Sequence, residues 1–419
     1  MIKKAIVLLI FTMMTFCGKA QNVITIEECQ QLAVAQSSAN VQKELNEQLL
    51  QVKLNDAASH YYPNVEIEGG IGYFSQLTEL PSQCPGYQKM PHDMYSISLH
   101  LQQVVFDGLQ ATYGRKRERL LNKNEINKLD ISINKIKEQV ISIYLNLLII
   151  EKQITILSNV EKNLQEQNEQ LKALLKAGVV YGNSIAQLDV EKLKIQQQKD
   201  ELQATKESLI SSLSILTGKN LSDATFAVPK IKEIEKTTAS TRCEFDIFKN
   251  EKANLDYLSK MHLSKSLPKI SFFALGGYGR PTFNLLNPNL DWSYAVGLQF
   301  KIPLIDWARS KGVSDIIVLQ KAILESQESD FTKANQIAIQ EKINEILKIE
   351  HQLLLDDQII SKYQEIKQTA STQLLNGTIT IFDFLKQQHD ETQSIIAKEV
   401  HSIQLLKTQY ELLALKGQL

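Results

Sequence analysis

The sequence predicts a mainly α-helical protein with a small β part, organised as two structural repeats that each contain two β-strands and one long helical hairpin. Two long runs are free of proline, because all nine prolines lie before residue 109 or between residues 218 and 304. Four shorter segments alternate apolar and polar residues, as half-buried strands do. Landmark residues also recur 199 positions apart, which indicates an internal repeat.

Residues 1–20 predict a signal peptide. Lys3 and Lys4 precede an apolar run, and Gly18-Lys19-Ala20 is a small-residue cleavage site. A membrane anchor is the alternative, but the apolar run is shorter than the roughly 20 residues that a span requires. Lipid modification at Cys17 is disfavoured by the bulky Phe16 before it. No later run of 18 uninterrupted apolar residues occurs, so we expect no transmembrane helix after export.

The first repeat, residues 21–218, opens with a helical pattern from Thr25 to about His60. Tyr61-Tyr62-Pro63 ends this helix, because proline and the residue before it resist the α conformation. Alternating residues then predict strands at about 63–75 and 94–106. Each is about ten to twelve residues long, which is the length of a tilted membrane-spanning strand.

A helical hairpin over residues 109–217 completes the first repeat. Its first arm has an apolar line at spacings of three and four, formed by Leu129, Ile133, Ile136, Val140, Ile143, Leu147, Ile150, Ile154 and Leu157. Such a line is typical of a helix that packs lengthwise against other helices. A helix end and a new helix start are predicted within Ala177–Ser184. At about 1.5 Å per residue the first arm would be about 100 Å long, too long for a compact domain.

The second repeat, residues 245–419, follows a polar linker at 219–244. It contains a short helix, strands at about 269–280 and 291–303, and a hairpin over 307–417. The offset of 199 residues relates Asp107 to Asp306, Gly178 to Gly377, and Gly218 to Gly417. A constant offset through long helices indicates that the two hairpins are equivalent.

The composition argues against an enzyme and against a nucleic-acid-binding protein. The formal net charge is −1, whereas nucleic acid selects strongly basic surfaces. The sequence has no P-loop, phosphate-binding glycine motif or nucleophile motif. The 7 histidines are scattered, and Cys29, Cys84 and Cys243 lie far apart. We therefore expect no metal site and no cofactor, and either one disulfide bond or none.

The strands are predicted to form part of a membrane barrel. Four strands cannot close a barrel, and unpaired strand edges cannot face lipid, so other chains must complete it. Eight strands would need two chains and twelve would need three. The alternation assigns these residues to the lipid-facing side: Val65, Ile67, Tyr95, Leu99, Trp292, Val296 and Phe300. A soluble sheet with one buried face is the alternative, which export and the long helices disfavour.

The order of elements resembles the TolC family of outer-membrane efflux channels. The resemblance rests on Tyr62-Pro63 and Leu267-Pro268 before strands, on Gln103–Gly108 with its counterpart Ile302–Trp307, and on the bends at Lys176–Ser184 and Leu375–Asp383. It implies that three chains form a twelve-stranded barrel in the outer membrane of a Gram-negative bacterium, with a twelve-helix tunnel in the periplasm.

The resemblance also implies partners and functional residues. The helical tips would meet a periplasmic adaptor (membrane fusion protein) bound to an inner-membrane pump. The tip residues are Gly178, Val179, Asn183, Ser184, Gly377, Thr378 and Phe382. The family closes its tunnel with aspartates six and nine residues after the second turn glycine; Asp383 matches the first position, and Lys386 replaces the second. An ordinary helix cap explains Asp383 equally well.

The function implied by the resemblance is a passive exit duct for small molecules or proteins, in a tripartite efflux or type I secretion system. The alternative is a periplasmic adaptor or a structural coiled-coil protein. Adaptors usually contain one helical hairpin between other modules. Two hairpins and four amphipathic strands fit the duct better.

Overall fold

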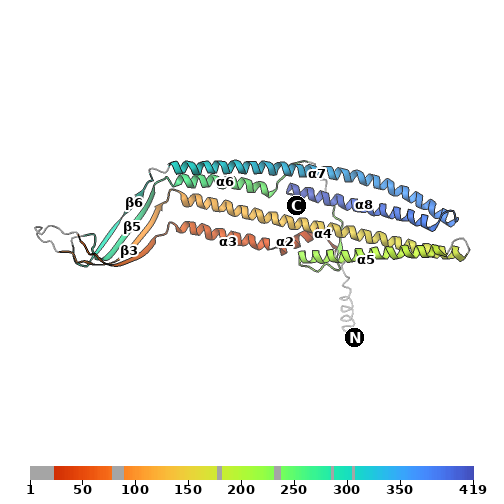
Figure 1. The fold of residues 1–419 in the computed structure, drawn as a ribbon, viewed down its shortest axis with the longest axis horizontal. Coiled ribbons are helices and arrows are strands. Elements are labelled where there is room, and N and C mark those ends of the chain that lie inside the picture. The colour runs from red at the N-terminus through yellow and green to blue at the C-terminus, as the bar shows by residue number, and fades with distance from the viewer. Residues whose placement is uncertain (1–22, 78–88, 177–181, 231–236, 285–286, 304–306) are drawn as a thin grey trace, which may run out of the picture. The chain divides into compact units, whose positions relative to one another are not determined.

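The computed structural model of the chain describes residues 23–77, 89–176, 182–230, 237–284, 287–303 and 307–419. The predicted signal peptide lies outside them. The helices are α2 (Ile26–Gln36), α3 (Ser38–Ser59), α4 (Gln110–Lys176), α5 (Asn183–Thr217), α6 (Cys243–Ser264), α7 (Trp307–Leu375) and α8 (Ile381–Lys416) (Figure 1). The strands are β1 (Val23–Ile24), β2 (Asn64–Tyr73), β3 (Asp93–Phe106), β4 (Thr225–Phe226), β5 (Lys269–Arg280) and β6 (Asp291–Lys301). The predicted fold class is confirmed: each strand pair, β2–β3 and β5–β6, precedes a long helical hairpin.

The chain forms two compact units, and neither coincides with one predicted repeat. One, the helical unit, takes residues up to Gln42, Lys128–Cys243 and Asp330–Leu419. The other, the sheet unit, takes Lys43–Asn127 and Glu244–Ser329. Segments from both halves of the sequence are therefore needed to build either unit.

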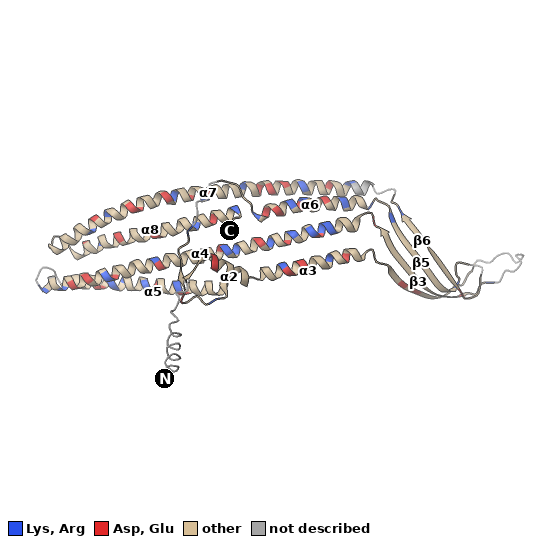
Figure 2. Ribbon diagram, turned by 180° about the vertical axis from the view of Figure 1, so that it is seen from behind, with Lys and Arg blue, Asp and Glu red and all other residues tan. Residues whose placement is uncertain are grey.

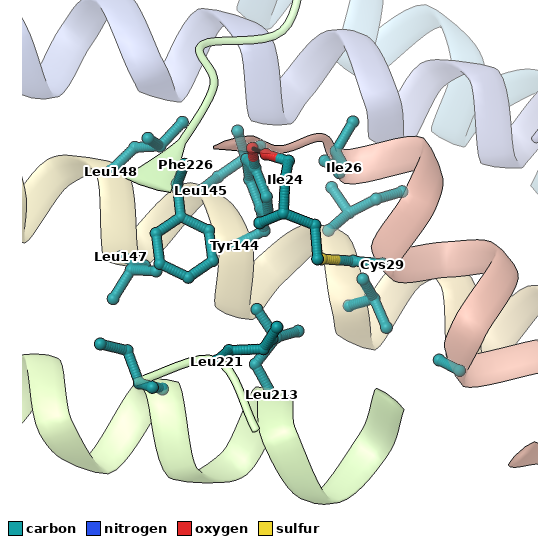
Figure 3. Packing of buried hydrophobic residues seen from close by; sticks show 14 of the residues in the cluster. Ile24, Ile26, Cys29, Tyr144, Leu145, Leu147, Leu148, Leu213, Leu221 and Phe226 are labelled. Carbon is teal, nitrogen blue, oxygen red and sulfur yellow. Dashed lines mark hydrogen bonds between the residues drawn. The ribbon is translucent and has the colours of Figure 1, made fainter. Parts of the chain in front are cut away.

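The main core of the helical unit gathers side chains from α2, α4, α5 and α8 around a two-stranded parallel sheet of β1 and β4 (Figure 3). Tyr144 of α4 is fully buried at its centre. Its hydroxyl lies 2.8 Å from the carbonyl oxygen of Ile24 and 2.7 Å from that of Ala227. Because a buried phenol requires a hydrogen-bond partner, this contact positions β1 and the segment after β4 against α4.

The predicted apolar line of α4 is largely buried, and it also gives the helix an unexpected property. By length and composition alone, Gln110–Ala173 could cross a membrane, because one 18-residue window has a mean hydropathy of 1.6. No such segment was expected, because no 18-residue apolar run follows the predicted signal peptide. The same stretch supplies Val140, Leu145 and Leu147 to the core, so packing against other helices explains its hydropathy.

In the sheet unit, four helices lie side by side in the order α3, α4, α6, α7. Lys53 of α3 forms an ion pair with Glu118 of α4 at 3.1 Å. Asn124 of α4 donates a hydrogen bond to Glu251 of α6 at 2.7 Å. Lys252 of α6 in turn forms an ion pair with Glu328 of α7.

The contact between α4 and α6 contains buried polar side chains. Asn124 of α4 and Asn254 of α6 are buried there, and Asn127 and Asn250 are buried on the same two helices. Glu251 accepts hydrogen bonds from Asn124 and also from Asn254, the latter at 3.2 Å. Buried amides at a helix contact favour one register over others, because a shifted register would leave more of them without partners.

The link from β3 to α4 explains the motif Gln103–Gly108. The carboxylate of Asp107 accepts a hydrogen bond from the backbone N–H of Ala111 at 2.6 Å, which caps the start of α4. Gly108 has a φ of 74°, in the left-handed region. A Cβ atom at this position would lie 2.6 Å from the carbonyl oxygen of Ser264 on α6. Only glycine fits this turn without a shift of the backbone.

We expect Gly108→Ala to destabilise the protein by about 1–2 kcal/mol from the left-handed conformation alone, and by more because of the contact with Ser264. Thermal unfolding in detergent measures the effect. Gly114→Ala is the matched control, because Gly114 lies inside α4 and a Cβ there would meet its nearest neighbour, Met261, at 3.8 Å. An equal melting temperature for both variants would contradict the role given to Gly108.

Candidate functional site

The first candidate surface is one face of the four-stranded sheet. Its order is β2–β3–β5–β6, and every neighbouring pair is antiparallel. Residues that pair directly share a face. Ile67 pairs with Leu99, Leu99 with Gly276, and Gly276 with Tyr294. Following these registers places all seven residues that were assigned to lipid on the same side, the apolar sheet face.

This apolar face is exposed. The exposed fractions of its seven assigned residues run from 41% for Tyr95 to 77% for Trp292. Ile71, Ile97 and Leu298 extend the same face and are exposed as well. Charged residues are sparse on the strands and frequent on the helices (Figure 2). A contiguous apolar surface of this kind indicates contact with a membrane or with another protein.

Aromatic side chains gather at the end of the face that lies farthest from the strand-to-helix links. The rings of Tyr278 and Trp292 are 5.2 Å apart. The guanidinium of Arg280 lies 5.4 Å from the centre of the Tyr95 ring and forms an ion pair with Asp93. Aromatic rings beside charged groups are typical of the level at which a membrane barrel meets water.

The opposite face of the sheet is polar and built from small residues. A Cβ at Gly277 would lie 2.7 Å from the carbonyl oxygen of Ile97, and one at Gly279 would lie 2.4 Å from that of Tyr95. The alternation pattern missed this requirement, although the run Gly276–Gly279 was a visible signal. On the same face, His100 lies 3.4 Å from Glu68.

The second candidate surface is the tip of the helical unit, where α7 turns into α8. Gly377 has a φ of 69°. Its N–H donates to the carbonyl of Leu374 at 3.0 Å, and the N–H of Thr378 donates to that of Gln373 at 2.9 Å. This Schellman turn ends α7 and requires a residue that tolerates a positive φ. At the other tip, Gly178 and Val179 lie outside the described residues, and Asn183 begins α5.

An apolar cluster lies beneath the tip. Its buried members are Leu171, Leu188, Ala370, Leu374, Ile381 and Phe384. Phe382, predicted as a tip residue, is 65% exposed, whereas Phe384, which was not predicted, is 2% exposed. The signal for Phe384 was its spacing of three residues from Ile381, which places both on one side of α8.

Asp383 belongs to a capping box at the start of α8. Its carboxylate accepts a hydrogen bond from the Thr380 backbone N–H at 3.1 Å and another from the Thr380 hydroxyl at 2.6 Å. The Thr380 oxygen accepts one from the Asp383 N–H at 3.3 Å. The bonds from Thr380, followed by the nearby charge of Lys386, lower the pKa of Asp383. The N-cap is Thr380, and Asp383 is the third residue of the helix.

Asp383 and Lys386, the two gate candidates, line different grooves. Asp383 lines a groove of about 390 Å³ between α7 and α8, together with Glu365 and Gln387. Lys386 lines a groove of about 690 Å³ between α5 and α8. The second groove is named the tip groove here; besides Lys386 it is lined by Asn183, Ala186, Gln187, Val190, Glu191, Lys194, Gln198, Phe382, Leu385 and His389.

The remaining predicted tip residues do not all gather at this groove. Asn183 and Phe382 line it, whereas Ser184 is a buried residue of α5. Thr378 is in the turn after α7, where its hydroxyl donates to the Gln373 carbonyl at 2.9 Å. Within the part of the chain that the structure describes, no group of three His, Cys, Asp or Glu side chains is arranged to hold a metal ion. Cys29 is a buried thiol in the main core, where burial raises its pKa to about 11.

These elements form a fold that is shared with solved outer-membrane proteins. Among solved structures, the outer membrane protein VceC of Vibrio cholerae matches with a TM-score of 0.70 at 11% identity, covering 93% of this chain and 96% of VceC. The CmeC outer membrane channel of Campylobacter jejuni matches with a TM-score of 0.69 at 15% identity, over 94% and 85% of the two chains. The MtrE outer membrane channel of Neisseria gonorrhoeae matches with 0.68 at 11%, over 94% and 88%. No family model and no curated protein matches the sequence.

We predict that the capping box stabilises the first turn of α8 at neutral pH and that acid weakens this stabilisation. Because folding lowers the pKa of Asp383, its contribution is present at neutral pH. It is lost as pH falls below the ordinary aspartate value of about 3.9 towards the lower folded value. In acid, the backbone amides of the first turn of α8 should therefore exchange their hydrogens faster than the intrinsic pH dependence of exchange predicts. Asp383→Asn should lose this dependence while Thr380→Val keeps a weaker form; identical profiles in all three proteins would contradict the prediction.

Proposed function

We propose that the chain is one subunit of an outer-membrane channel-tunnel, a passive exit duct for small molecules or proteins in a tripartite efflux or type I secretion system. The observation that carries this proposal is the exposed apolar sheet face, backed by a polar face of small residues. Apolar outside and polar inside is the arrangement of a membrane barrel with an aqueous interior.

The sheet must be closed by other copies of the chain. Among the described strands, β2 and β6 each have one neighbour, so the outer edge of each lacks a backbone partner. In lipid such an edge is too costly to remain open. Three copies would supply twelve strands, and the likeness in fold to solved outer-membrane channels supports a homotrimer. The barrel would lie in the outer membrane of a Gram-negative bacterium, with the helices in the periplasm.

The helical tips are the proposed docking site for a periplasmic adaptor joined to an inner-membrane pump, which would supply the energy. The tip groove suits the apolar face of a partner helix, because Val190, Phe382 and Leu385 line it. Lys194 and Lys386 add two positive charges and Glu191 adds one negative charge, so acidic residues on the partner would be favoured. The turns around Gly178 and Gly377 would present this surface.

Asp383 is the proposed gate residue at the same tips. Three copies around an axis would form a ring of carboxylates, which concentrates cations in a narrow opening. Lys386 is close enough to lower the pKa of Asp383, yet it lines the tip groove. We therefore assign Lys386 to the docking surface and Asp383 to the gate.

A periplasmic adaptor or a structural coiled-coil protein remains the alternative function. Either would leave the exposed apolar sheet face without a purpose. The solved structures that share the fold along 93% of this chain include outer-membrane channels, which favours the duct.

The decisive experiment purifies the mature protein from membranes in detergent, measures its mass by light scattering, and records conductance after insertion into planar bilayers. We expect a particle of three chains and discrete conductance steps. A water-soluble monomer, or a detergent-bound trimer that never conducts, would contradict the proposal. Boiled protein controls for leakage caused by detergent.

The gate is tested with two variants that affect the same capping box differently. Asp383→Asn removes the charge and retains an acceptor oxygen, whereas Thr380→Val weakens the cap and retains the charge. If the carboxylate forms a gate, Asp383→Asn should change single-channel conductance and weaken block by divalent cations, and Thr380→Val should change neither. Equal effects of the two variants would indicate that Asp383 acts only as a helix cap and would contradict the gate.

A further inference from the structure

We propose that a group of basic and aromatic side chains on α4 and α6, named the basic cluster here, binds the phosphate groups of anionic phospholipids at the periplasmic surface of the outer membrane. Its members are Tyr113, Lys116 and Arg119 on α4, and Tyr257 and Lys260 on α6. The inference rests on the proposed membrane channel and adds to it a lipid site on the helices next to the sheet.

The basic cluster is centred on the ring of Tyr257. The ammonium group of Lys116 lies 5.6 Å from the centre of this ring, and the ammonium group of Lys260 lies 5.2 Å from it. The ring of Tyr113 is 6.4 Å away and tilted by 33°. Cation–π attraction favours both lysines at this place. Two neighbouring helices therefore present their positive charges beside one aromatic ring.

The charges of the basic cluster are not neutralised by acidic side chains of the described residues. Lys116, Arg119 and Lys260 are exposed, and none of them forms an ion pair in this part of the chain. Glu118 of α4, in contrast, pairs with Lys53 of α3. Lys and Arg are frequent in the part of α4 that adjoins the sheet (Figure 2). The positive charge is therefore available to a ligand from outside the chain.

Backbone pairing determines the left-to-right order of the strands. Just beyond the ends of β2 and β3, the Phe74 N–H donates to the His92 carbonyl at 2.8 Å. Every second residue of β3 from His92 on, including Ser98, therefore directs its backbone groups towards β2. Ser98 is on the polar face. For L-residues this places β2 to the left of β3 when the polar face is viewed with the helices below. Seen from the apolar face, α6 is then to the left of α4.

The right-handed turn of α4 shows which of its sides carries the basic cluster. Arg117 and Asn124 face α6, because they form hydrogen bonds with Asn254 and Glu251. Viewed from the sheet end, each residue lies about 100° clockwise from the one before it. Lys116, one residue before Arg117, therefore points to the same side as the apolar sheet face.

The other members of the basic cluster follow Lys116. Arg119 lies three residues further along α4, on the same side of the helix. Tyr257 and Lys260 share this side through the contacts around the Tyr257 ring. The basic cluster and the apolar sheet face are thus on one side of the sheet unit.

The basic cluster also lies at the height of the membrane boundary. The apolar sheet face continues to Phe300, one residue before the end of β6. Counted from the sheet ends of α4 and α6 at about 1.5 Å per residue, Lys260 is about 6 Å away, Lys116 about 9 Å and Tyr257 about 10 Å. The headgroup layer beside the hydrocarbon is roughly 5–8 Å thick. Long lysine side chains reach into this layer, and tyrosine is enriched there.

A lipid surface fits the basic cluster better than an acidic protein does. Side-chain contacts order the helices as α3, α4, α6, α7, so α4 and α6 are the inner pair. Copies that close the sheet at β2 and β6 would leave the outward faces of this pair uncovered. A lipid whose acyl chains cover the apolar sheet face would have its phosphate next to Lys116 and Lys260.

The test measures phospholipid bound to the purified oligomer by native mass spectrometry. The oligomer in detergent is titrated with phosphatidylglycerol, which is anionic, or with phosphatidylcholine, which is zwitterionic. We expect the unchanged protein to retain several-fold more phosphatidylglycerol. Lys116→Gln/Lys260→Gln should remove most of this preference, because the charges that attract the phosphate are lost. Lys116→Arg/Lys260→Arg should keep it.

The matched control is Lys135→Gln/Lys162→Gln, which makes the same change of charge on α4. Both control lysines are exposed, and they lie roughly 38 and 78 Å along the helix from its sheet end. This variant should bind phosphatidylglycerol as the unchanged protein does. An equal loss in both glutamine variants would show that net charge alone attracts the lipid, and would overturn the basic cluster as its site.

Conductance and light scattering of the same samples separate the remaining outcomes. A conducting oligomer in which Lys116→Gln/Lys260→Gln retains full phosphatidylglycerol binding would overturn the lipid site, in favour of another acidic ligand, and leave the channel intact. Displacement of the lipid by an equal concentration of inorganic phosphate would overturn a lipid surface as the occupant. A chain that neither oligomerises nor conducts would overturn both the channel and this site.

Discussion

The backbone hydrogen bonds of four strands determine in what form this sheet could enter a membrane. Each interior strand of β2–β3–β5–β6 is paired on both sides, while β2 and β6 are each paired on one side among the described strands. In hydrocarbon an open edge is too costly, so the sheet can enter a membrane only as part of a closed ring. The apolar face has the same implication, because many of its side chains are exposed in the single chain.

The helices that adjoin the strands have the same spatial order as the strands. Each strand of the sheet is continuous with one helix of the layer, so the order β2–β3–β5–β6 becomes α3, α4, α6, α7. The turn at Gly108 brings α4 within contact of Ser264 at the end of α6. Buried asparagines between α4 and α6 then favour a single register. Sheet and helices thus specify the same neighbours by different interactions, hydrogen bonding in one case and side-chain packing in the other.

The sequence predicted those features that depend on local periodicity. Alternation located the strands and their apolar sides, and pairing then aligned Ile67, Leu99 and Tyr294 because antiparallel neighbours share a face. Heptad spacing located the long helices. Contacts between distant segments could not be read in this way. The Tyr144 hydroxyl meets carbonyls 120 and 83 positions away, and the division into two compact units cuts across α4 and α7.

The capping role of Asp383 is compatible with the gate role that we propose for it. Both hydrogen bonds that its carboxylate accepts from Thr380 end on Oδ2, so the capping box does not use Oδ1. A carboxylate has about four acceptor positions, and two bonds leave capacity for water or a cation. The cap also holds the side chain at a defined place near the end of α8 and lowers its pKa, which keeps it charged. A ring of such groups would therefore be fixed in position by the same bonds that begin the helix, and capping would support a gate instead of competing with it.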